Sequence, residues 1–177
     1  PKSDTAVHFA ADGTISYFYE DPSTLAIALD CAIVRDVKLR IATASGASSE
    51  ITVQVNLPWD AARVREAMQA QIADNLTFDV IKGANTGDAG SVTENLVLPA
   101  RLASAGWATI SWTSGNDAIT VQPGKLPDID DGTGVVTRLS SDTTGSLTAT
   151  ITFNRDDSIS ITKDIPITVP AAEGEDH

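Results

Sequence analysis

The chain has 177 residues, 42% of them hydrophobic, and a formal net charge of −12. This length and composition predict one or two folded domains with a substantial core, and they exclude a chain that is disordered throughout. So acidic a surface repels phosphate groups, which argues against a nucleic-acid partner and against binding to an anionic membrane. The sequence has no run of 18 or more apolar residues, so no membrane insertion is expected.

Alternation of apolar and polar residues predicts antiparallel strands in the first 58 residues. The predicted strands cover residues 13–21, 24–34, 37–43 and 50–58. In the last of them, Ile51 and Val53 are expected on a half-buried face. Cys31 shares its strand parity with apolar neighbours and is expected to be a buried structural thiol. As the only cysteine, it cannot form a disulfide within the chain.

A helix is predicted directly after Pro58, over residues 59–73. Asp60 is placed to cap its first turn. The apolar residues Val64, Met68 and Ile72 recur every four positions and form a narrow stripe. The stripe is expected to pack on a sheet edge or at a domain junction, and Trp59 is expected at that junction.

Strand patterns return after the helix. The predicted strands cover residues 75–81, 92–99, 104–121, 135–140, 146–153 and 158–170. Loops are predicted between them, among them residues 125–134. The last seven residues, 171–177, are acidic and are expected to fray.

Two of the three tryptophans lie in the predicted strand 104–121. Parity places Trp112 on an aliphatic face with Ala108 and Ile110, where a large indole is expected to join the core. Trp107 falls on the opposite face among hydroxyl side chains, where it could stack on a sugar ring. It is therefore the candidate binding residue, although packing under a loop or against the predicted helix is the alternative.

The sequence offers no catalytic constellation, so no enzyme activity and no cofactor are expected. The two histidines, His8 and His177, lie far apart in the sequence and suggest no metal site. The candidate metal ligands are Asp128, Asp130 and Asp131, because clustered carboxylates in a glycine-containing loop suit Ca²⁺. Their spacing lacks the further ligands of an EF-hand, so a solvated turn is the favoured interpretation.

Several short motifs of the C-terminal region together resemble those of the atrophied bacterial immunoglobulin-like domain. The resemblance covers about residues 60–170. Gly115, where that family more often has serine, and a long loop at 122–134 depart from its pattern. The residues that carry the resemblance are Asn95, Leu96, Leu98 and Pro99, then Ile110, Ser111, Trp112, Ser114 and Asn116, then Asp131, Gly132, Val136, Thr137 and Arg138, and finally Leu147 to Ile151.

This resemblance implies an all-β fold of immunoglobulin-like β-sandwich modules, with one short helix at the start of the second module. It carries no catalytic residues. It implies a spacer context in a secreted or bacterial cell-surface protein, beside glycoside hydrolase domains or in adhesin-like arrays. The partners would then be the neighbouring domains of the same polypeptide.

The predicted domains are residues 1–58, residues 59–170 and a flexible acidic tail, 171–177. A faint repeat supports this division, because Asp-Gly-Thr at 12–14 and again at 131–133 leads through strands to Pro58 and to Pro170. Residues 1–58 are then the C-terminal part of a tandem immunoglobulin-like repeat, or alternatively a small complete β-domain. The predicted function is a non-catalytic spacer or interaction module, and the alternative is a carbohydrate- or host-protein-binding module.

Overall fold

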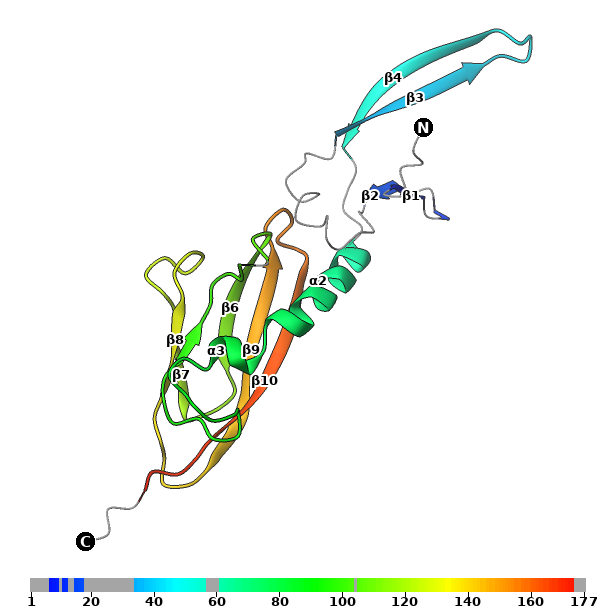
Figure 1. Ribbon diagram of the computed structural model, residues 1–177. Helices are drawn as coiled ribbons and strands as arrows, with labels where there is room; N and C mark the ends of the chain where they lie inside the picture. The colour runs from blue at the N-terminus through cyan, green and yellow to red at the C-terminus, as the bar shows by residue number, and fades with distance from the viewer. Residues whose placement is uncertain are drawn as a thin grey trace. The chain divides into compact units, whose positions relative to one another are not determined.

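The chain divides into two compact units, Pro1–Val64 and Arg65–His177, and each is described by itself. The division falls inside a helix, a few residues after the predicted boundary at Pro58. The computed structural model in Figure 1 describes residues 7–9, 11–12, 15–17, 34–56, 61–103 and 105–173.

The described part of the N-terminal unit consists of two antiparallel strand pairs. The strands are β1 (Val7–Phe9), β2 (Ile15–Tyr17), β3 (Val34–Ala42) and β4 (Ser48–Asn56), with β1 paired to β2 and β3 to β4. The turn between β3 and β4 holds Gly46 at a φ of 87°, a left-handed conformation that glycine adopts without steric strain. Cys31, Trp59, Asp60 and most of the strand predicted at 24–34 lie outside the described residues.

The β3–β4 hairpin is less buried than its sequence pattern predicts. Ile51 is 44% exposed and Val53 is 37% exposed, so the prediction of a half-buried face is wrong for these two residues. A two-stranded hairpin has no second layer of its own to cover an apolar face. The ion pair between Lys38 and Glu50, 3.4 Å long and exposed on both sides, adds little stability.

The C-terminal unit consists mostly of antiparallel strands in two sheets (Figure 1). The strand order is β10-β9-β6 in one sheet and β5-β8-β7 in the other. The prediction of an all-β architecture is confirmed at this level. The strand bounds are β5 (Leu96–Leu98), β6 (Ala108–Ser114), β7 (Ile119–Gln122), β8 (Gly132–Val136), β9 (Thr143–Phe153) and β10 (Ser160–Val169).

The central strand β9 shows why the two faces of its sheet differ. Leu147, Ala149, Ile151 and Phe153 are fully buried on one face, at the period of two that a strand requires. Each fully buried large apolar side chain stabilises the fold by about 1.5–3 kcal/mol. The intervening residues of β9, from Thr148 to Thr152, carry hydroxyls to the outer face.

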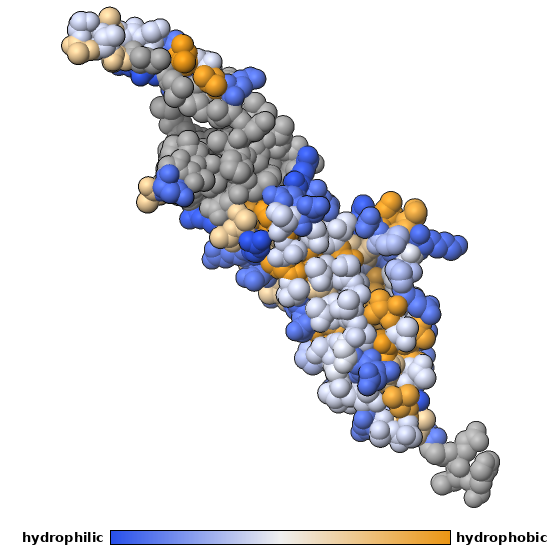
Figure 2. Space-filling model, turned by 180° about the vertical axis from the view of Figure 1, so that it is seen from behind, coloured by the Kyte–Doolittle hydropathy of each residue, from blue (hydrophilic) through white to orange (hydrophobic). Residues whose placement is uncertain are grey.

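The outer face continues this polar character across the neighbouring strands. The register places Thr109, Ser111 and Thr113 of β6 beside Thr152, Thr150 and Thr148 of β9. Viewed from behind, much of the C-terminal unit is pale, the colour of intermediate hydropathy (Figure 2).

The helix α2 (Ala61–Asn75) overlaps in sequence with the helix predicted at 59–73. Its residues Val64, Met68 and Ile72 are buried. Lys163 of β10 donates from Nζ to the carbonyl oxygens of Ile72 at 3.2 Å and of Ala73 at 2.6 Å, near the end of the helix. Lys163 shares the strand parity of the buried Ile161 and Ile165. The helix therefore covers the inner face of the β10-β9-β6 sheet and not its edge.

The strand predicted at 75–81 is wrong. This segment contains the end of α2 and a short helix, α3 (Phe78–Ile81). Leu76 and Ile81 are fully buried while Asp79 and Val80 are exposed, a spacing that no strand produces. The Lys82 amide donates to the Phe78 carbonyl at 2.8 Å and closes the helical turn.

The segment 104–121, predicted as one strand, forms two strands in different sheets. β6 ends at Ser114 and β7 begins at Ile119, with a corner between them. Asn116 is 2% exposed and fixes this corner. Its Nδ2 donates to the carbonyls of Thr143 and Ile167 at 3.2 and 3.0 Å, and its Oδ1 accepts from the Ala118 amide at 2.9 Å.

The tail predicted to fray from residue 171 begins as ordered structure. The Ala171 amide donates to Asp142 Oδ1 at 2.8 Å, and Arg138 donates to the Ala171 carbonyl. The Ala172 amide donates to the Leu139 carbonyl at 2.7 Å. Residues 174–177 lie outside the described part of the chain.

Candidate functional site

Trp107, the candidate binding residue, is buried and 5% exposed. It lies in the turn before β6, so strand parity does not determine its direction. Its ring centroid lies 6.5 Å from that of Phe153, and its Nε1 donates to Gln71 Oε1 of α2 at 3.2 Å. The prediction of an outward platform is therefore wrong, and the alternative of packing against the helix describes this residue.

Trp112 has the predicted parity but not the predicted burial. It lies opposite the buried Ala149 on the inner face of its sheet. Its Nε1 donates to the Pro99 carbonyl at 3.0 Å, which fixes the indole. The side chain is nevertheless only half-buried, because one side of it borders an open hollow.

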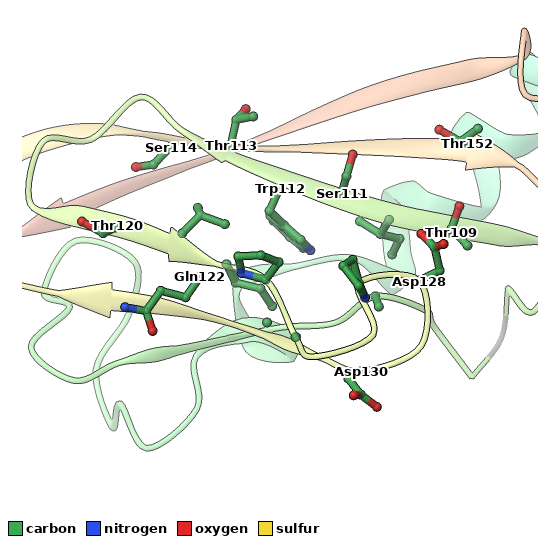
Figure 3. Close-up of a pocket in the computed structure, with 18 of the residues that line it drawn as sticks. Thr109, Ser111, Trp112, Thr113, Ser114, Thr120, Gln122, Asp128, Asp130 and Thr152 are labelled. Carbon is green, nitrogen blue, oxygen red and sulfur yellow. The ribbon is translucent and has the colours of Figure 1, made fainter.

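The hollow has a volume of about 720 Å³ and lies between β6, β7 and the loop after β7. Figure 3 shows Trp112 projecting from β6 toward this loop, while Ser111 and Thr113 point to the other side of the strand. Its lining combines apolar side chains with hydroxyls, an amide and two carboxylates. Those that the site depends on are Leu98, Ile110, Trp112, Gln122, Asp128 and Asp130.

The loop of residues 123–131 is closed by its own hydrogen bonds. The amides of Ile129 and Asp130 donate to the Leu126 carbonyl at 2.8 and 2.7 Å, and the Leu126 amide donates back to Asp130 Oδ2 at 3.1 Å. A Cβ at Gly124 would lie 2.3 Å from the Asp130 carbonyl oxygen, so this close approach requires glycine. The loop is therefore a fixed wall of the hollow.

The candidate metal ligands do not converge. Asp131 Oδ1 accepts from the Ala100 amide at 3.2 Å, and Asp130 Oδ2 is held within the loop. Asp128 accepts from Arg101 Nε through its backbone carbonyl, at 2.7 Å, and lines the hollow. Within the described ranges, no three His, Cys, Asp or Glu side chains are grouped to hold a metal ion.

We expect Ca²⁺ to leave the stability of the protein nearly unchanged. Asp130 and Asp131 accept backbone hydrogen bonds from different segments, and these bonds hold the two carboxylates in positions that do not converge on one ion. Millimolar Ca²⁺ should therefore move the Tm by less than about 1 °C relative to EDTA. A rise of several degrees that Asp130→Ala abolishes would contradict this expectation.

Sequence reasoning missed the position of Trp112 beside the hollow and the strand edge that carries it. Strand parity favours Trp107 as the outward tryptophan only if the strand extends through residues 105–107, which form a turn. The sequence does hold a signal for the end of the strand, because Ser114-Gly115-Asn116-Asp117 is turn chemistry.

Comparison with protein-family models, with curated proteins and with solved structures gives no match. Among the helices that the structure describes, none is long and apolar enough to cross a bilayer.

Proposed function

We propose that the chain is a non-catalytic module that connects other parts of a larger protein in line, as a spacer and interaction domain. The observation that supports this is the path of the chain through the C-terminal unit. The chain enters at one end of the sheets and leaves at the other. Such a path extends an array instead of folding back on it.

Two contacts define the direction of this path. Near the start of α2, Arg65 donates to the Ser158 carbonyl at 3.2 Å, just before β10 begins. Near the end of α2, Lys163 donates to the carbonyls of Ile72 and Ala73. The helix and β10 therefore run in the same direction, and β10 continues to Val169. At about 3.3 Å per residue, β10 alone is about 30 Å long.

The strand order supports an immunoglobulin-like type within this proposal. If β5 to β10 are taken as strands B to G, strand E lies between B and D, and strand F lies between C and G. This is the order of the constant-type immunoglobulin sandwich without its first strand. The helix α2 precedes β5, where the first strand would stand, and it covers the inner face of the opposite sheet.

The proposed setting is a secreted or cell-surface bacterial protein, with neighbouring domains of the same polypeptide as partners. The net charge of −12 suits such a role, because like-charged modules repel one another and stay soluble. In this proposal residues 1–58 and 59–170 are successive modules, the first being the C-terminal part of a repeat.

A distance measurement tests the in-line path. Spin labels at Glu66→Cys and Glu173→Cys, in a Cys31→Ser background, should give one narrow distribution centred at about 30–40 Å. A matched pair at Glu66→Cys and Asp157→Cys, both near the entry end, should give less than about 20 Å, since Arg65 contacts Ser158. A short or broad distribution for the first pair would contradict the spacer proposal.

The second candidate function is binding of carbohydrate or of a host protein, and the half-buried Trp112 beside the hollow favours it. An indole with one face open to a polar hollow can stack on a sugar ring. A glycan array probed with wild type and Trp112→Ala tests the carbohydrate form. Binding that Trp112→Ala removes, and Trp107→Phe retains, would support this candidate.

A further inference from the structure

The strand β6 has one edge without a partner strand. β9 pairs with its other edge, and among the described residues no strand pairs with this one. The Ile110 amide donates on this side to the Ala100 carbonyl at 2.8 Å. Alternate residues of an antiparallel strand direct their backbone groups to the same edge, so Trp112 and Ser114 face this side too. Among the described residues, the only backbone partner on this edge is Ala100, which pairs with Ile110. None pairs with the backbone groups of Trp112 or Ser114 on this side.

The other edge strands of the C-terminal unit are short or closed. β5 and β7 have only three and four residues. On β10, Thr168 exchanges hydrogen bonds with Ala89 and Val92, at 2.8 and 3.0 Å, and Pro166 has no amide to donate. β6 has seven residues and neither proline nor lysine. An edge of this kind is a template for pairing with another chain, which proteins otherwise block.

The hollow lies along this open edge and provides room for the side chains of an added strand. The hollow, which has a volume of about 720 Å³, begins at β6 and extends under Trp112 to the loop after β7. An extended peptide paired to β6 would direct every second side chain into it. Those side chains would meet the open side of the Trp112 indole and the apolar residues Leu98, Ile110 and Val121.

The charge of the lining indicates which peptide fits. Asp128 and Asp130 line the hollow, and none of the lysines and arginines in the described ranges does. Figure 3 shows Asp128 on the side of Thr109, at the end of β6 where the chain enters the strand. The Asp130 carboxylate points away from Trp112 and accepts from the Leu126 amide, so Asp128 is the carboxylate that a peptide would meet. A cationic side chain beside Asp128 would be attracted, and an anionic one would be repelled.

We propose that the open edge of β6 binds an extended peptide by strand addition. Apolar side chains of the peptide pack on Trp112, and a lysine or arginine pairs with Asp128. The backbone groups of Trp112 and Ser114 supply the hydrogen bonds. This site is independent of the in-line path, so failure of either proposal leaves the other standing.

Selection from a display library of random nine-residue peptides tests the proposal on the full chain. Enriched peptides should alternate apolar residues with lysine or arginine. One of them, added to the ¹⁵N-labelled protein, should slow hydrogen exchange at the amides of Trp112 and Ser114 by tenfold or more. The amide of Thr162, on the distant strand β10, should exchange as before.

Three variants locate the site. Ser114→Pro removes an edge amide and should weaken binding at least tenfold. Because Ser114 also accepts from the Asn116 amide at 3.1 Å, this variant can disturb the corner. Thr113→Lys is therefore the second variant, because a lysine on the exposed outer face of an edge strand disfavours strand pairing, and it should weaken binding at least fivefold. The matched control Thr162→Lys adds the same charge on an exposed site of β10 and should bind within twofold of wild type.

The proposal is overturned by a failure to enrich any peptide above the level seen with Thr113→Lys. It is equally overturned if the enriched peptides protect amides elsewhere, or if both lysine variants bind alike. Saccharide binding that shifts the Trp112 signals, without peptide binding, would assign the hollow to carbohydrate instead.

Discussion

Replacing Trp107 by alanine should lower the free energy of unfolding by about 3–5 kcal/mol, the range for large aromatic residues removed from a core. Trp107 is almost completely buried, contacts Phe153 and donates to Gln71 of α2. Its loss would leave a cavity between the helix and the sheet. Trp112→Ala should cost less, because the side chain already borders a hollow and removal only enlarges it.

Chemical denaturation followed by far-ultraviolet circular dichroism measures both effects. Trp107→Phe is the control, since it keeps an aromatic ring and loses the hydrogen bond to Gln71. Trp107→Phe should lower the free energy of unfolding by less than Trp107→Ala does. A larger loss for Trp112→Ala than for Trp107→Ala would show that Trp112 is the principal core indole.

The second large effect is expected for Asn116→Ala, which should cost about 3 kcal/mol or more, because each buried group left unpaired costs about 1–3 kcal/mol. The substitution leaves the carbonyl of Ile167 and the amide of Ala118 without the partners that Asn116 provides. It also frees the corner at which the chain passes from one sheet to the other.

Asn154→Ala is the matched control for this measurement. Asn154 is exposed and donates to the Gly106 carbonyl at 3.3 Å, so its removal should cost less than about 1 kcal/mol. Equal losses for the two variants would show that Asn116 is not a structural centre of the corner.

The regular parts of the C-terminal unit could be predicted from the sequence because their burial follows one period. β9 alternates between buried and outward residues from Leu147 to Phe153, and β10 does so along most of its length. The stripe at Val64, Met68 and Ile72 has the helical spacing, and all three are buried in α2. In these elements local periodicity and tertiary burial agree, so either one predicts the other.

The errors lie where a tertiary contact overrides the local pattern. The corner at Asn116 is an exception, because the apolar alternation of β6 stops there and the polar run at 113–117 signals the end of the strand. The segment 75–81 alternates in sequence, yet the burial of Leu76 and Ile81 fits a helical turn better. The open edge of β6 could not be predicted, because strand order decides which strands lie at an edge.

The parallel course of α2 and β10 gives the C-terminal unit unequal resistance to stretching. Tension applied at the two ends of this unit would load the β9–β10 ladder along its strands, so that its hydrogen bonds share the force. The same tension would peel α2 from its first turn, and the contacts of Arg65 and then Lys163 would break one after the other. The helix should therefore yield first and lengthen by about 2 Å per residue, from the helical rise of about 1.5 Å to the extended reach of about 3.3–3.6 Å, while the sheets stay folded. A domain that yields in this order would absorb a sudden pull by lengthening and would recover when the load falls.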